Sequence, residues 1–231
     1  MPDYSHLLDE TEKAFLDMLQ RFVAEDLIPK AAATDETGKF VHEQIKALAE
    51  TGMMGANLPE QWGGADISSH ALFEAVAMIA GGCGSTVSAL TAHYLATDSI
   101  LLGADDAMKA RILPRAAEGA LLGAFGLTEP NAGSDPADMK TRATREGDGY
   151  RIKGRKCFIS NGGVADFLIV YAVTDPTAAH KGISAFVVDK GTPGLTPGRI
   201  EKTMGLKGGH VWELDLDLYV PQENRLGPEG T

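Results

Sequence analysis

The sequence predicts an α+β fold, in which an amino-terminal all-α domain of residues 1–119 precedes a β-sandwich or β-barrel domain of residues 120–231. Two observations lead to this prediction. Apolar residues recur at spacings of three and four through the first half, which is typical of helices that bury one face. Beyond Gly119 the chain changes to short runs rich in β-branched and aromatic residues, separated by glycine and proline. Helices followed by strands favour two separate layers over alternating βαβ units.

Helical spacing occurs in five segments of the first domain. Acidic residues gather at the start of the first segment, and Pro29 stands just beyond its expected end. Ser68 or Ser69 is the candidate N-cap of the third. Pro114 is expected to kink or divide the last, because proline lacks the N–H group that a helix interior uses. The expected helices are residues 9–27, 42–51, 67–79, 86–102 and 105–118.

Strand patterns occur in six segments of the second domain. Glu-Gly-Asp-Gly at 146–149 lies between two of them and is typical of a hairpin turn. Glycine and proline at 191–194 and 197–198 indicate further turns. The expected strands are residues 121–127, 139–145, 150–160, 166–173, 182–189 and 211–220.

Composition narrows the class of protein. With 44% hydrophobic and 23% charged residues, the chain is typical of a soluble globular protein. The net charge of -11 argues against a nucleic-acid partner or an acidic membrane surface. Seven of the 21 basic residues nevertheless fall within residues 140–156. They suit a ligand that bears phosphates, but for most of them a solvated strand edge is the favoured interpretation.

Cysteine usage and the amino terminus indicate the compartment. Cys83 and Cys157 are far apart in sequence and form no metal-binding or redox motif, so both are expected to be reduced core thiols. The first residues carry neither a signal-peptide nor a transit-peptide pattern. The longest apolar stretch, residues 89–102, is interrupted by polar residues and is too short to span a membrane. A cytoplasmic protein is expected.

The segment of residues 124–163 is the most informative part of the chain. An apolar run ends abruptly at Thr128, because Pro130 two residues later cannot donate to a strand ladder. Turn-forming residues at 131–136, including Gly133 and Ser134, offer free backbone N–H groups and short hydroxyls. This loop is a candidate anion-binding site.

The end of the next expected strand adds an aromatic ring. Phe158 and Ser160 are two residues apart, so in an extended strand their side chains project from one face, as do those of Phe125 and Leu127. Two such strand ends side by side would form a wall for a flat heteroaromatic ring with a phosphate tail. For either strand end alone, an ordinary strand-to-loop junction is the simpler interpretation.

The order of these motifs resembles the acyl-CoA dehydrogenases over essentially the whole chain. Leu-Thr-Glu-Pro-Asn-Ala-Gly-Ser-Asp at 127–135 is followed by Lys-Cys-Phe-Ile-Ser-Asn-Gly at 156–162 and by Val-Pro-Gln-Glu-Asn-Arg-Leu-Gly at 220–227. Leu-Pro-Glu-Gln-Trp-Gly-Gly at 58–64 also fits. The long first motif is specific, and the second follows at the distance that the family has.

The resemblance implies FAD as cofactor and an acyl-CoA thioester as substrate. The reaction is α,β-desaturation, with electrons passed to an electron-transfer flavoprotein, in an enzyme that is normally an oligomer. Ser134 is implied to approach both the FAD pyrophosphate and the acyl-CoA, and Phe158 and Ser160 to lie beside the isoalloxazine ring. The implied cofactor-binding residues are Phe125, Leu127, Thr128, Gly133, Ser134, Phe158, Ile159 and Ser160.

The sequence departs from the family pattern in two places. It stops at residue 231, where family members continue into a helical bundle that carries the catalytic glutamate, so no catalytic residue is expected within these residues. Glu129 belongs to the motif loop and Asp135 to a turn, and neither is assigned as the base. Lys-Gly-Gly-His at 207–210 replaces a segment that more often has arginine, a small residue and serine.

Three alternatives therefore stand. The chain is part of an acyl-CoA dehydrogenase, or a short subunit that completes a flavin site with a partner chain supplying the bundle, or a non-catalytic binding or assembly protein that kept the fold. A flavin oxidase or monooxygenase with the same fold is a further alternative. Acyl chain length stays open, because several apolar residues fit either a core or a pocket. These residues are Met53, Met54, Leu90, Tyr94 and Leu95.

Overall fold

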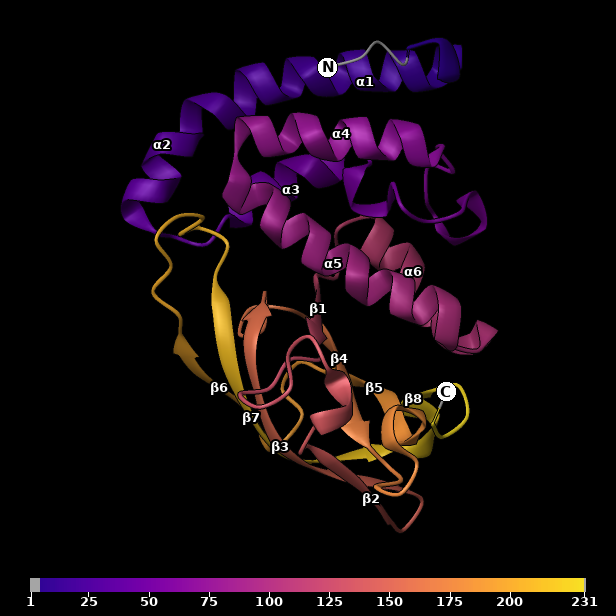
Figure 1. Cartoon of the computed structure of the whole chain (residues 1–231). Coiled ribbons are helices and arrows are strands. Elements are labelled where there is room, and N and C mark those ends of the chain that lie inside the picture. The colour runs from indigo at the N-terminus through magenta and orange to yellow at the C-terminus, as the bar shows by residue number, and fades with distance from the viewer. Residues whose placement is uncertain (1–4, 231) are drawn as a thin grey trace.

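The computed structural model describes residues 5–230 and places a helical layer on one end of a curved β domain (Figure 1). The predicted fold class, an all-α domain followed by a β domain, is confirmed. The helices are α1 (Glu10–Phe22), α2 (Ile28–Thr37), α3 (His42–Glu50), α4 (Ser69–Gly82), α5 (Gly84–Gly103) and α6 (Asp106–Ala117).

The first helix ends differently from the sequence prediction. Asp9 and Glu12 form a capping box at the start of α1, and Glu12 also accepts a hydrogen bond of 2.7 Å from the N–H group of Ser68 at the start of α4. After Phe22 one π-helical turn, Val23–Leu27, leads directly into α2. Pro29 lies in the first turn of α2, directly after this π-helical turn. The expected end of the helix before Pro29 is therefore replaced by a continuous passage from α1 into α2.

Helix α5 is the central element of the helical layer. Its middle is buried on nearly all sides, as its alanine-rich sequence without an apolar stripe suggests. Asp105 caps α6 through the N–H group of Met108, and α6 runs without division through Pro114. Of the two effects predicted for this proline, a kink or a division, the division does not occur.

The described strands form one mixed sheet of eight strands. They are ordered β6-β7-β3-β2-β4-β5-β8, and β1 pairs in parallel with β4. The hairpin turn predicted at 146–149 joins β2 to β3. The strands are β1 (Gly123–Gly126), β2 (Arg142–Glu146), β3 (Gly149–Ser160), β4 (Phe167–Val173), β5 (Ile183–Asp189), β6 (Leu195–Ile200), β7 (Val211–Pro221) and β8 (Arg225–Leu226).

The sequence prediction missed β6 and β8. Strand β6 pairs with β7 alone and contains Pro197, which the sequence analysis assigned to a turn. Proline is compatible with a strand at the edge of a sheet, where no second neighbour needs its N–H group. Strand β8 has two residues, too few to produce a periodic pattern.

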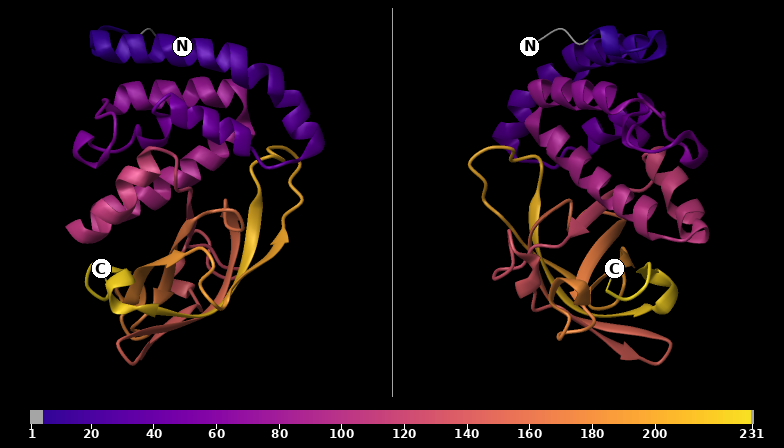
Figure 2. Two further views of the ribbon diagram at one scale, coloured as in Figure 1. Left: turned by 180° about the vertical axis from the view of Figure 1, so that it is seen from behind. Right: turned by 45° about the vertical axis from the view of Figure 1, so that its right-hand side comes forward.

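The two layers share one apolar core. Residues of α5 and α6 pack against β4 and β5, with Ile100 and Ile112 meeting Phe167 and Val187 in a single cluster. Figure 2 shows α5 lying across the end of the β domain next to β1. The contact between α5 and β1 positions the motif segment, because β1 begins that segment.

Two further sequence expectations concern cysteines and membranes. Cys83 and Cys157 are both buried and free, as expected. Within residues 5–230, no helix has the length and apolar character needed to cross a membrane.

Candidate functional site

The two halves of the motif segment meet at the ends of β1 and β3. After β1 the chain continues through Leu127 to Thr128, whose carbonyl accepts a hydrogen bond of 3.0 Å from the N–H group of Cys157 in β3. The strand ends therefore lie side by side. We call the six residues of these ends that sequence analysis selected the candidate wall. They are Phe125, Leu127, Thr128, Phe158, Ile159 and Ser160.

A β-bulge sets the direction of Phe158. The pairing of β3 with β7 shifts register between Lys156 and Ile159. Phe158 has φ of 58°, in the left-handed region that bulky residues rarely adopt, and its side chain is 63% exposed. The sequence argument assumed regular extended backbone, and that assumption is wrong at Phe158. An exposed aromatic residue held in a costly backbone conformation is nevertheless typical of a binding surface.

The other residues of the candidate wall are less exposed. Phe125, Leu127, Thr128 and Ser160 are half-buried, whereas Ile159 is buried. The ring of Phe125 contacts Tyr171 with ring centroids 5.1 Å apart. A partly exposed surface is therefore formed by side chains from both segments.

The loop after β1 has space for an anion. Gly133 and Ser134 are exposed, and a side chain at Gly133 would meet no atom within 4 Å. Packing within the described residues therefore does not require a glycine at this position. Asp135 accepts a hydrogen bond of 2.9 Å from the N–H group of Ala137, which is the turn role expected from the sequence.

Behind the candidate wall lies a buried ion pair that sequence analysis did not identify. Lys156 Nζ is 2.8 Å from Glu129 Oε1, and the two side chains are 0% and 3% exposed. Burial lowers the pKa of Lys156 to about 8, although the ion pair with Glu129 opposes this effect. Burial alone would raise the pKa of Glu129, but hydrogen bonds from Lys156, Thr141 and Lys140 outweigh it, and the pKa is lowered.

A neutral polar cluster fixes the start of β1. The N–H group of Gly123 donates to His93 Nδ1 at 3.0 Å, so His93 carries its proton on Nε2 and donates it to the carbonyl of Met54. Asn161 Nδ2 donates to the carbonyls of Gly123 and Ala89. Burial lowers the pKa of His93 to about 4. His93 is thus buried with both ring nitrogens hydrogen-bonded.

Next to Phe125 a cleft of about 550 Å³ opens between the end of α5 and the β domain. Leu95 and Asp98 line it, and Ser99 lies 3.3 Å from the hydroxyl of Tyr171. Burial raises the pKa of Asp98, against a hydrogen bond from Asn57. Of the five residues left open between core and pocket, Leu95 is 51% exposed and lines the cleft. The other four are buried in the helical core: Met53, Met54, Leu90 and Tyr94.

Most basic residues of the segment 140–156 pair with carboxylates on the protein itself. Arg151 and Lys153 both contact Asp217 of β7, and Arg155 contacts Glu213 and Asp215. These ion pairs link β3 to its antiparallel neighbour β7, and most of their side chains are exposed. The prediction of a strand edge is wrong, because β3 lies between β7 and β2 in the interior of the sheet. The basic residues are nevertheless solvated, and their pairing with carboxylates argues against a phosphate site.

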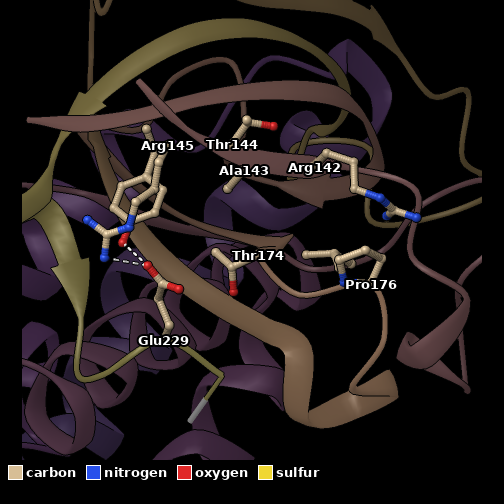
Figure 3. A pocket seen from close by; sticks show the side chains of 9 residues that line it. Arg142, Ala143, Thr144, Arg145, Thr174, Pro176 and Glu229 are labelled. Atoms are coloured by element: carbon tan, nitrogen blue, oxygen red, sulfur yellow. Dashed lines mark hydrogen bonds and ion pairs between the residues drawn. The ribbon is translucent and has the colours of Figure 1, made fainter. Parts of the chain in front are cut away.

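A second, smaller hollow of about 230 Å³ lies at the far end of the β domain (Figure 3). Glu229 accepts hydrogen bonds there from Arg145 and from the hydroxyl of Tyr150, and Arg225 also contacts both Tyr150 and Glu229. Arg145 and Arg225 both pair with Glu229 in this hollow. Arg142 also lines it and donates to the carbonyl of Met139 at 2.7 Å.

The loop of residues 201–210, which departs from the family pattern, packs on the helical domain. Gly208 lies close to Thr34 and Lys39, and its N–H group donates to Ser85 at 3.1 Å. His210 Nε2 donates to the carbonyl of Gly38 at 2.7 Å. The segment 207–210 therefore forms contacts between the domains, and Gly208 is needed because a side chain there would collide with Thr34.

Within residues 5–230, no group of three or more His, Cys, Asp or Glu side chains is placed to hold a metal ion.

Comparison with known proteins identifies the two domains. Residues 9–120 match the model described as acyl-CoA dehydrogenase, N-terminal domain, and residues 124–218 match acyl-CoA dehydrogenase, middle domain. A cyclohex-1-ene-1-carbonyl-CoA dehydrogenase of Geobacter metallireducens is 43% identical, over 97% of this chain and 60% of that protein.

Solved structures agree with these matches. Butyryl-CoA dehydrogenase from Megasphaera elsdenii is 36% identical with a TM-score of 0.92, over 100% of this chain and 61% of that chain. The prolyl acyl carrier protein oxidase AnaB is 30% identical with a TM-score of 0.91, over 97% of this chain and 60% of that chain. The chain thus spans about 60% of the length of the relatives it matches. It belongs to the acyl-CoA dehydrogenase family.

Proposed function

We propose that this chain forms the amino-terminal and middle parts of an FAD-dependent acyl-CoA dehydrogenase. The observation that carries the proposal is the meeting of two motif segments at the Thr128–Cys157 hydrogen bond, with Phe158 exposed beside them. Membership of the acyl-CoA dehydrogenase family also supports FAD as the cofactor. Similar proteins are named as dehydrogenases of CoA thioesters, which supports a CoA thioester as the substrate.

The residues present fit a flavin. Phe158 offers an exposed ring for stacking, and the bulge holds it in place. Ser160 and Thr128 offer half-buried hydroxyls for the edge of a ring. Gly133 and Ser134 offer open backbone and a hydroxyl for the pyrophosphate. Phe125 and Leu127 would supply apolar contacts, and Ser134 would also approach the acyl-CoA. The side chain of Ile159 is buried in the core of the β domain, which leaves only its backbone for a contact with the cofactor.

FAD, when bound, supplies the acceptor for the hydride that leaves the β carbon of the acyl group. The residues of this chain orient the ring and exclude water from one of its sides. Glu129 is unsuited to remove the α proton, because its carboxylate is buried and already accepts hydrogen bonds from Lys156, Lys140 and Thr141. We therefore assign no catalytic base within these 231 residues.

The cleft beside Phe125 is the proposed entrance for the acyl group. It lies between α5 and the β domain, and its walls combine Leu95 and Leu102 with the polar Ser99 and Asp98. Electrons would leave to an electron-transfer flavoprotein, and the working enzyme is proposed to be an oligomer or to pair with a chain that supplies a helical bundle.

An oxidase is the second candidate function. The solved relative AnaB, which is named as an oxidase of a prolyl acyl carrier protein, covers the same two domains at 30% identity. The candidate wall serves either chemistry, since both need a positioned flavin. A short non-catalytic subunit that completes a flavin site with a partner chain would use the same candidate wall.

The test uses the full-length protein, loaded with FAD, and a series of saturated acyl-CoA thioesters. The proposal predicts enoyl-CoA formation and flavin bleaching without oxygen, with turnover sustained by an electron-transfer flavoprotein. Turnover that requires oxygen and yields hydrogen peroxide would favour the oxidase. A full-length protein that neither binds FAD nor bleaches with any thioester would contradict the proposal.

A further inference from the structure

Lys156 stands at the point where β3 changes register. It is the last residue paired with β7 before the bulge that contains Phe158. Its side chain is 0% exposed, which is unusual for lysine. The ammonium group donates to the carbonyl of Leu127 at 3.0 Å and to Glu129 at 2.8 Å. A residue of one motif segment thus contacts the backbone of the other directly.

Glu129 extends this contact to a third segment. Its carboxylate accepts hydrogen bonds from the N–H groups of Lys140 at 2.7 Å and Thr141 at 3.0 Å. The backbone of Glu129 also bonds in both directions with Ala132, at the start of the exposed loop. One ion pair therefore holds the end of β1, the two ends of the loop of residues 130–139, and the bulge of β3.

A gain in folding stability is a weak explanation for the presence of a buried ion pair. Removing two charges from water costs free energy that their attraction often fails to recover, and well-packed apolar residues usually stabilise a core as well or better. An apolar pair, however, would leave the carbonyl of Leu127 and two N–H groups without partners. The ion pair sets directions and distances that apolar contacts do not set.

We propose that Lys156 and Glu129 are positioning residues for the flavin, which fix the spacing between the Leu127–Thr128 segment and the Phe158–Ser160 segment. The carbonyls of residues 127 and 128 are held by two successive residues of β3, the first by Lys156 Nζ and the second by Cys157 N–H. The candidate wall consequently keeps one geometry before any ligand binds. This inference rests on the proposed FAD site.

The experiment separates positioning from stability with charge-neutral double variants. Lys156→Met combined with Glu129→Gln removes both charges and keeps the volume and a carboxamide oxygen that can accept from Lys140 and Thr141 N–H. Lys156→Gln with Glu129→Gln is the second pair. Arg155→Met is the matched control, since Arg155 is the next residue of β3 and its side chain is 53% exposed. All variants are made in the full-length protein.

Three quantities are measured for each variant: the thermal midpoint of the apoprotein, the dissociation constant for FAD, and the visible absorption spectrum of the bound flavin. For the Lys156→Gln pair, whose carboxamide can still donate a hydrogen bond, we expect a thermal midpoint close to that of the parent. For the Lys156→Met pair, which cannot donate to the Leu127 carbonyl, we expect a lower midpoint. Both pairs are expected to raise the dissociation constant for FAD about tenfold or more and to shift the flavin band. The Arg155→Met control is expected to match the parent in all three.

A double variant with parental FAD affinity and spectrum would overturn the inference, because the pair would then serve the fold alone. If neither double variant folds, the pair is required for folding itself, and the assignment as positioning residues is likewise overturned. Failure of the parent to bind FAD would contradict the proposed function instead, and is recognised because it occurs without any substitution.

Discussion

The candidate wall is held in place by two buried polar contacts of opposite electrical character. The charged contact is the Lys156–Glu129 ion pair, which lies inside the β domain and joins the two motif segments. The neutral contact consists of His93 and Asn161, which bond to the N–H group and the carbonyl of Gly123 and join β1 to α5. One contact shapes the wall, and the other fastens it to the helical layer.

The difference in charge predicts which change weakens each contact most. An ion pair that loses one partner leaves an uncompensated buried charge, which is among the most costly changes in a protein core. A neutral hydrogen-bonded cluster loses less when one group is removed, but it depends on His93 staying uncharged. Substitution should therefore damage the charged contact more, and mild acid should damage the neutral contact first.

Loss of one charge is expected to have the largest effect. Lys156→Met leaves Glu129 buried without its ammonium partner, so the free energy of unfolding should fall by about 3–5 kcal/mol. Urea unfolding measures the change. Lys153→Met is the control, because Lys153 is 64% exposed in its pair with Asp217 and should cost less than about 1 kcal/mol. Equal effects of the two substitutions would refute the special role of the buried pair.

Mild acid is expected to have the next largest effect. The pKa of His93 is about 4 in the folded protein and near 6.5 in the unfolded chain. At a pH between these values, His93 is protonated in the unfolded chain but neutral in the folded protein. Stability is then complete above pH 6.5 and falls as the pH drops toward 4, by about 3 kcal/mol. Urea midpoints at several pH values measure this loss, and His93→Gln should flatten the curve in this window. An unchanged slope in that variant would assign the loss to other groups.

Removal of the Asn161 side chain is expected to cost less. Asn161 has φ of 63°, so Asn161→Gly keeps the backbone conformation and deletes only the bonds to Ala89 and Gly123. A loss of about 1–3 kcal/mol is expected. In a double-mutant cycle, Asn161→Gly and His93→Gln should be non-additive, since both act on Gly123. Strict additivity would show that the two groups do not form one contact.

The sequence was a better guide to elements and motifs than to these contacts. Periodic helices such as α1, and the hairpin at 146–149, were predicted because their signals are local. Strand β6 was missed because its pairing with β7 and its edge position, which make Pro197 acceptable, are not local properties. The continuation of α1 into α2 was missed because a proline is common both just after a helix and in the first turn of a helix. Pro29 alone therefore does not distinguish the two cases.

The same limit applies to the candidate site. The motif residues Phe158 and Ser134 stand out by residue type, but the bulge that turns Phe158 outward arises from pairing with a distant strand. Lys156 looked like one more basic residue in a run of seven, and only its burial against Glu129 distinguishes it. A lysine directly before an apolar strand end, with an isolated glutamate in a preceding motif, was the available signal. The roles of the eight predicted cofactor-binding residues stay predictions until a ligand is tested.

The account depends most on the claim that the candidate wall binds a flavin, and titration of the full-length apoprotein with FAD tests it directly. Phe158→Ala is compared with Phe73→Ala, because Phe73 on α4 is 73% exposed but lies outside the wall. Loss of ring stacking at Phe158 should weaken FAD binding by about 0.5–1.5 kcal/mol and shift the visible absorption band, whereas Phe73→Ala should match the parent. An unchanged affinity and spectrum for Phe158→Ala would contradict the claim.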